Sequence, residues 1–233
     1  ATLILYVIML LASTWGMLIF LGIRFYRSMY TDEGYLSHTL PVTANQLFLS
    51  KILVSGVWYL FISIGIGISV VALVVSLMTG LLNIGELSSV LTQYNGNIWE
   101  FLADAFYELG RTYEEEMGIN LLHYGITLLL TYVAGPFITM VTLFGALTIG
   151  QLSSKHKGFM GILTYAGVTI LSSIIGSTVQ SAFMFGTNVM SSSGGFSVTT
   201  NMAYDINVIT SLLIAAIMYG VSYYIMNRKL NLD

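Results

Sequence analysis

Residues that could carry chemistry are few in this chain, and they lie mostly between long apolar segments. There is no cysteine, so thiolate metal sites and cysteine nucleophiles are excluded. There is also no G-x-S-x-G elbow, no H-E-x-x-H zinc pair and no glycine-rich loop ending in Lys-Ser/Thr. We therefore assign no catalytic, cofactor-binding or metal-binding residue, and we expect that the chain is not an enzyme by itself.

One ionisable side chain approaches an apolar segment closely, and it is His123, near the outer end of the third segment. Ion-coupled carriers and proton pumps need ionisable groups at bilayer depth. The apolar segments contain no Asp, Glu, Lys or Arg between their flanks. A histidine that faces water or lipid headgroups explains this position better than a proton relay does. Any work of transport must then draw its energy from another chain.

The segment between the first two apolar runs carries the clearest structural signals. Thr43-Ala-Asn-Gln46 has the Thr-x-x-Gln form of a capping box, with Pro41 ahead of it and apolar residues including Phe48 behind it. This spacing predicts a short helix from about Ala44 that continues into the second apolar run. Two interpretations of this segment stay open: a compact surface that contacts a partner, and an amphipathic element that rests on the lipid.

The amino-acid composition indicates a membrane protein. Of the 233 residues, 56% are hydrophobic and 8% are charged, and the mean hydropathy is +0.82. A water-soluble domain carries roughly 25% charged residues. This chain has too few charged side chains to cover the surface of such a domain. A crossing helix needs about 20 mostly apolar residues. We predict one all-α transmembrane domain over residues 1–233, with spans at about 2–23, 51–82, 121–152, 159–185 and 207–226.

The distribution of charge predicts the orientation of these spans. Apart from Arg111, the Lys and Arg residues lie in the loop at 24–50 and its flanks, in the third loop and in the C-terminal tail. Basic residues in short loops stay in the cytoplasm. The loops at 83–120 and 186–206 are acidic instead, so we place them outside the cell and the C-terminus inside. The net charge of −3 and the lack of a basic stripe argue against a nucleic-acid partner.

Three further features concern the shape of the bundle. In the outer loop at 83–120, apolar residues recur at helical spacing, which predicts an amphipathic helix that lies on the outer leaflet or caps the bundle. Gly135-Pro136 inside the third span predicts a kink. Small residues spaced by four, such as Ser63 and Gly67, allow close approach of another helix; they indicate intrachain packing, a dimer seam or the lining of a pathway.

The first cytoplasmic loop also resembles that of a known family. The shared run comprises Asp32-Glu33-Gly34-Tyr35-Leu36, Thr39-Leu40-Pro41-Val42, Gln46 and Leu49-Ser50-Lys51. It looks like the first cytoplasmic loop of membrane subunits of type-2 ATP-binding-cassette (ABC) exporters, especially those of Gram-positive bacteria. Those subunits have six spans, and Ala1 would begin just before the second of them. The resemblance therefore implies six spans in the full chain, of which five are visible.

The resemblance implies a function for this loop. It would contain the coupling helix that fits a groove on a separate cytoplasmic ATPase, which binds the ATP and magnesium. A second permease subunit, identical or related, and the bilayer of a bacterial plasma membrane are the other implied partners. The residues assigned to ATPase coupling are Asp32, Glu33, Gly34, Tyr35, Leu36, Leu40, Pro41, Gln46, Phe48 and Lys51.

Several functions remain to be weighed. The leading hypothesis is a permease subunit that exports peptides, antimicrobials or other amphiphiles. The alternative is a noncatalytic membrane scaffold, an immunity or sensor protein without transport. A secondary carrier would require a hidden polar site among hydroxyl and amide side chains. An embedded enzyme comes last, because no pair of nucleophile and base can be assigned.

Overall fold

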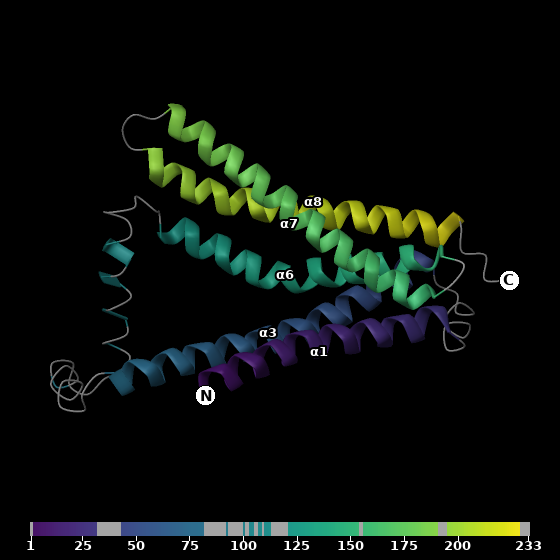
Figure 1. Cartoon of the computed structure of the whole chain (residues 1–233), viewed down its shortest axis with the longest axis horizontal. Helices are drawn as coiled ribbons and strands as arrows, with labels where there is room; N and C mark the ends of the chain where they lie inside the picture. The colour runs from purple at the N-terminus through teal and green to yellow at the C-terminus, as the bar shows by residue number, and fades with distance from the viewer. Residues whose placement is uncertain are drawn as a thin grey trace.

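The chain is built from helices. The computed structural model describes residues 2–31, 43–81, 121–153, 156–190 and 195–228, together with positions 92, 100, 103–104, 107–108 and 110–112. These described parts contain no strand, in agreement with the all-α prediction. The long helices, labelled as in Figure 1, are α1 (Thr2–Tyr30), α3 (Ala44–Leu81), α6 (Leu121–Gly150), α7 (Lys157–Met190) and α8 (Gly195–Arg228).

Five helices in the described chain are long and apolar enough to cross a membrane, which confirms the predicted number of visible spans. Very little of each span is covered by the rest of the chain: of the most apolar part of α3, none is buried. Large apolar side chains such as Ile8, Phe61 and Leu129 are instead exposed around the bundle. Exposing this much apolar surface to water would be unfavourable, whereas the hydrocarbon core of a lipid bilayer accommodates it. The chain is therefore an all-α, multi-pass membrane protein.

Helices α1, α7 and α8 extend beyond the predicted spans. We ended the first span at Ile23, but α1 continues to Tyr30, because Phe25 and Met29 are buried against other helices. We placed an outer loop at 186–206, but α7 continues to Met190 and α8 begins at Gly195. The Ser-, Thr- and Gly-rich composition of this region favours a loop, and the polar ends of two long helices occupy most of it instead.

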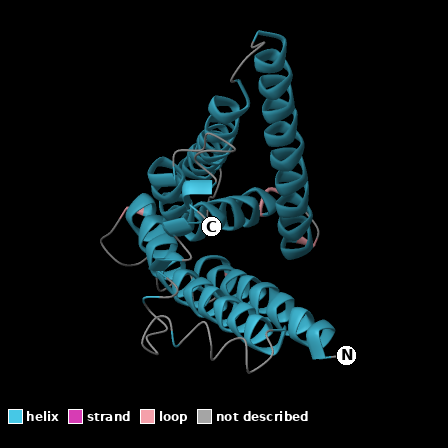
Figure 2. Ribbon diagram, turned by 90° about the vertical axis from the view of Figure 1, so that its left-hand side faces the viewer, coloured by secondary structure: helices cyan, strands magenta, loops and turns pink. Residues whose placement is uncertain are grey.

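The helices form two groups that meet at one end of the molecule. Helices α1 and α3 lie side by side, and α6, α7 and α8 form the second group (Figure 1). The two groups are inclined to each other, so that they diverge toward the end where the N-terminus lies (Figure 2). Helix α6 joins them, since it contacts each of the other four helices.

The buried core lies where the two groups meet. The ring of Phe25 is stacked on that of Phe144, with centroids 4.0 Å apart and planes 5° apart. Phe25 also meets Phe48 edge-on at 5.9 Å, and Phe48 lies 5.8 Å from the ring of Tyr219. Through these four rings, α1, α3, α6 and α8 share one aromatic cluster. It lies near the C-terminal ends of α1, α6 and α8 and near the start of α3.

Glycines allow the closest approaches around α6. A side chain at Gly150 would bring a Cβ within 2.4 Å of the Gly161 backbone nitrogen, so α6 and α7 meet backbone to backbone there. The turn that joins them contains His156 with a φ of 54°. A Cβ at Gly56 of α3 would come within 2.4 Å of the ring of Phe137. Pro136 lies inside α6, as predicted, and α6 changes direction near its middle (Figure 1).

Candidate functional site

The predicted capping box exists at the start of α3. The backbone amide of Thr43 donates to Gln46 Oε1 at 3.1 Å, and the amide of Gln46 donates to Thr43 Oγ1 at 3.3 Å. These two bonds satisfy donors that a helix leaves without an internal partner at its N-terminus. The helix begins at Ala44, as the spacing predicted, and runs without a break to Leu81. The capped turn is therefore the end of a single 38-residue rod.

Phe48 corrects one of the predicted roles. We assigned it to direct contact with a partner, but its side chain is 0% exposed and lies in the aromatic cluster. Its helical position faces α1 and α8 rather than the outside, because Phe25 and Tyr219 supply apolar and aromatic surface for it. In this conformation Phe48 cannot touch a partner directly. It joins the start of α3 to the rest of the bundle.

Hydrogen bonds reinforce this junction. The Tyr219 hydroxyl of α8 donates to Oδ1 of Asn45, which lies between the two ends of the capping box. On the other side of the cluster, Thr148 Oγ1 donates to the Phe144 carbonyl, so the Tyr30 hydroxyl must be the donor in its 2.8 Å bond to Thr148. Tyr219 therefore bridges α8 and α3.

The remaining coupling residues fall into two sets. Gln46 is exposed at the capped turn and Lys51 is partly buried one turn further on. The other predicted coupling residues lie outside the described residues; they are Asp32, Glu33, Gly34, Tyr35, Leu36, Leu40 and Pro41. Among the described residues, the accessible part of the predicted site is thus the turn from Thr43 to Gln46 and the exposed Leu49 and Ser50.

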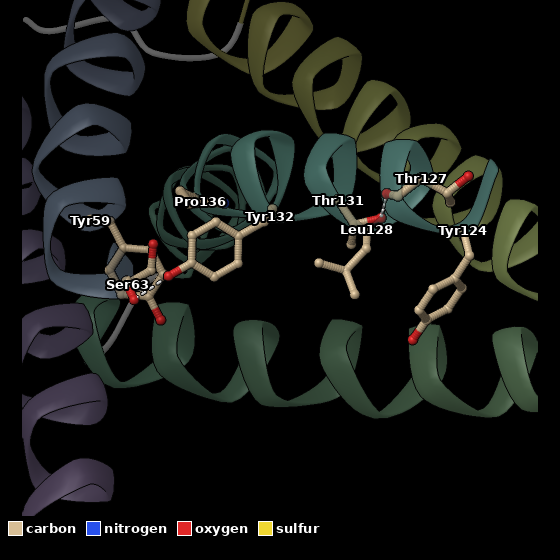
Figure 3. Close-up of a pocket in the computed structure, with 9 residues that line it drawn as sticks. Tyr59, Ser63, Tyr124, Thr127, Leu128, Thr131, Tyr132 and Pro136 are labelled. Atoms are coloured by element: carbon tan, nitrogen blue, oxygen red, sulfur yellow. Dashed lines mark hydrogen bonds between the residues drawn. The ribbon is translucent and has the colours of Figure 1, made fainter. Parts of the chain in front are cut away.

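A groove lies between α3 and α6, away from the aromatic cluster. Its volume is about 390 Å³, within the usual range of small-ligand sites. It is formed by Tyr59, Ser63, Tyr124, Thr127, Leu128, Thr131, Tyr132, Gly135 and Pro136. Figure 3 shows Tyr132 reaching from α6 toward Ser63 of α3, and Tyr124 and Leu128 pointing to one side of α6.

Most of the hydroxyl groups around this groove are donors to protein acceptors already. Tyr132 donates to the Ser63 carbonyl, Ser63 donates to the Leu60 carbonyl at 2.8 Å, and Thr131 donates to the Thr127 carbonyl at 2.7 Å. The groove residues carry no formal charge at neutral pH. What the groove offers a ligand is therefore mainly carbon surface and aromatic rings.

A polar cluster lies at one end of the groove, where α6 meets α8. His123 Nε2 is 3.0 Å from Asp205 Oδ2, and Thr127 Oγ1 donates to Asp205 Oδ1 at 3.2 Å. The side chains of His123 and Asp205 are 48% and 38% exposed. Thr127 thus belongs both to the lining of the groove and to this polar cluster. We expected His123 near the outer end of the third span, whereas position 205 fell in the predicted loop at 186–206; the structure places Asp205 in α8 and pairs it with His123.

A second, smaller groove between α6, α7 and α8 has a volume of about 220 Å³. It includes several hydroxyl residues, among them Thr142, Thr169 and Ser172. Each of these three donates to a carbonyl of its own helix. Such bonds are the ordinary state of Ser and Thr within a helix. This groove therefore gives little indication of a ligand.

No protein-family model, curated protein or solved structure matches this chain. The described residues also hold no group of three His, Asp or Glu side chains that could bind a metal ion. Two candidate sites thus stand on geometry: the capped start of α3, and the α3–α6 groove with the His123–Asp205 pair at its end.

Proposed function

We propose that the chain is the membrane subunit of an ATP-driven exporter of the ABC type, working with separate cytoplasmic ATPase subunits. The observation that carries this proposal is the construction of the start of α3. A capped, exposed turn is continuous with a long membrane helix and is fixed to α1, α6 and α8 through Phe48 and its aromatic neighbours. The loop that precedes this turn also resembles the coupling loop of such exporters.

This construction suits the transmission of movement. An α-helix is stiff along its axis because each backbone N–H is bonded within the helix. A displacement of the Thr43–Gln46 turn would therefore move α3 as one body. The bond from Tyr219 to Asn45 and the contacts of Phe48 would carry part of that displacement to α8 and α1. A loosely tethered loop would absorb the same displacement instead.

The charge pattern supports the proposed orientation. Arg24 and Arg27 lie beside Phe25 in α1, Lys51 follows Phe48 by three residues in α3, and Lys157 begins α7 next to the end of α6. His123 lies near the start of α6 and Asp205 lies in the first half of α8, so both are far along their helices from the aromatic cluster. By the positive-inside rule, the end with the capped turn faces the cytoplasm, where an ATPase would be available.

The interior of the bundle supports an external source of energy. The described spans contain no pair of ionisable side chains at their middle that could couple transport to an ion gradient. Peptides, antimicrobials and other amphiphiles are the proposed substrates. A second subunit, identical or related, would cover part of the exposed apolar surface and complete a pathway.

Association with an ATPase tests the proposal. The protein is extracted in mild detergent from the membrane of its own bacterium, and the proteins that copurify are quantified by mass spectrometry. We expect an ATPase with a P-loop in a stoichiometric amount. Substitution Glu33→Lys should reduce its yield, because it reverses a charge in the proposed coupling loop, whereas Glu108→Lys in the outer segment should not.

Two results would contradict the proposal. One is the reproducible lack of an ATPase from protein that remains folded and monodisperse. The other is an equal loss of the ATPase in the Glu33→Lys and Glu108→Lys variants. The first result would favour the noncatalytic scaffold, since such a protein needs no source of energy.

A further inference from the structure

We propose that the α3–α6 groove binds the aliphatic chain of a cationic amphiphile, whose positively charged head lies over Asp205. This inference deepens the proposed function, on which it rests, by naming the chemical class of the substrate and the place where it binds. The observation behind it is the position of Thr127, which lines the uncharged groove and donates a hydrogen bond to the exposed carboxylate of Asp205.

The chemistry of the groove favours an aliphatic chain. The donors of Ser63, Thr131 and Tyr132 are occupied by protein carbonyls, so a polar ligand would find few groups to replace its bonds to water. Leu128, Pro136 and the faces of the tyrosine rings provide apolar contact. An alkyl chain loses no hydrogen bonds when it enters such a groove, and packing contacts with the groove wall hold it there.

The chemistry of the groove's end favours a cationic head. Asp205 carries a carboxylate that is 38% exposed, with Thr127 and His123 on its two oxygens. A negative field of this kind attracts cations and disfavours anionic lipid headgroups. Charge complementarity thus selects an ammonium or guanidinium head.

The two parts together select an amphiphile. A small hydrophilic cation would use Asp205 but leave the groove empty, and an uncharged lipid tail would use the groove but not the carboxylate. A molecule that has an aliphatic chain and a cationic head fills the groove and also contacts the carboxylate. The zwitterionic and anionic lipids of the surrounding bilayer are the competing occupants, and the experiment has to separate them from the proposed one.

Photolabelling of the purified full chain in lipid nanodiscs provides the test. The probe is a long-chain alkyl-trimethylammonium with a diazirine on its chain, and the matched probe has the same chain on an uncharged maltoside head. Labelled peptides are identified by mass spectrometry, and the concentration for half-maximal labelling is measured. We expect the cationic probe to label α3 and α6 around Ser63 and Leu128 at a lower concentration than the neutral probe.

Variants separate the head from the chain. Asp205→Asn should raise the half-maximal concentration of the cationic probe about tenfold, the effect of losing one charged contact, and leave the neutral probe unchanged. Unchanged labelling by the neutral probe also shows that the groove of this variant is intact. Leu128→Trp fills the groove and should abolish labelling by both probes. Leu129→Trp, at an exposed residue outside the groove, is the matched control and should label as the original protein does.

Each other outcome overturns the inference. Equal labelling by both probes would mean that the groove accepts any lipid tail. Equal effects of Leu128→Trp and Leu129→Trp would mean that the probe binds elsewhere. The measurement uses this chain without an ATPase, so a failure here leaves ATPase association untouched, and a lack of ATPase association leaves the labelling result untouched.

Discussion

At the scale of single residues, one feature of the start of α3 could be predicted from the sequence and another could not. The capping box could be predicted because Thr43 and Gln46 interact within one turn, and local spacing determines such contacts. The burial of Phe48 could not be predicted in the same way, since it depends on Phe25 and Tyr219, which come from distant parts of the chain. The same reason explains why the pairing of His123 with Asp205 was missed.

The capping box gives the first residue-scale prediction. Thr43→Ala should destabilise the first turn of α3 by about 1 kcal/mol, because the Gln46 amide loses its acceptor. Hydrogen exchange of the amides at 44–47 should become faster. Ser50→Ala, which removes a bond to the Leu47 carbonyl without changing the cap, should leave these amides unaffected. Unchanged exchange in Thr43→Ala would show that the cap does not hold the turn.

The hydrogen bond from Tyr219 of α8 to Asn45 of α3 gives the second residue-scale prediction. Tyr219→Phe keeps the ring beside Phe48 but removes the hydroxyl that bonds Asn45, so the free energy of unfolding should fall by about 1 kcal/mol. Thermal unfolding in detergent measures this loss. The control is Tyr223→Phe, at a ring that is 45% exposed, and it should have no effect. Equal stability of the two variants would argue against the bridge.

At the scale of elements, composition predicted the number of long helices but not their ends. A run of about 20 apolar residues is sufficient evidence for a span. The extension of α1 to Tyr30 depends on tertiary burial of Phe25 and Met29, and the early start of α8 at Gly195 lies in a polar stretch that composition assigns to a loop. The predicted amphipathic segment at 83–120 lies mostly outside the described residues.

The contact of α6 with α7 gives an element-scale prediction. Gly150→Ala should destabilise the protein by about 2 kcal/mol, because its Cβ would overlap the Gly161 backbone and force the two helices apart. Gly158→Ala near the same turn is the matched control, since a Cβ there meets no atom within 4 Å. Thermal unfolding compares the two variants. A Gly150→Ala protein as stable as Gly158→Ala would mean that the helices do not pack this closely.

At the scale of the whole molecule, the two ends of the bundle differ in packing and in charge. The aromatic cluster joins four helices at the end rich in basic residues, whereas the two helical groups diverge toward the other end (Figures 1 and 2). Movement applied at the joined end would therefore change the separation of α3 and α6, the helices that form the groove. This relation connects the proposed coupling site with the proposed binding site.

The orientation gives a prediction at this scale. The chain has no cysteine, so single cysteines can be introduced without a background. A membrane-impermeant maleimide applied to intact cells should label Thr112→Cys in the outer segment and should not label His156→Cys in the α6–α7 turn. Both positions are exposed, and permeabilised cells provide the control. The reverse pattern would invert the proposed orientation.

The most direct test of the central proposal is site-specific crosslinking from the capped end of α3. A photoreactive amino acid at Ser50, which is exposed one turn beyond the capping box, is compared with one at Thr112 in native membranes. We predict a covalent adduct between position 50 and an ATPase with a P-loop, in an amount that changes when ATP is added, and no such adduct from position 112. An ATPase adduct at neither position, or equally at both, would contradict the proposal that this end of α3 couples the chain to ATP hydrolysis.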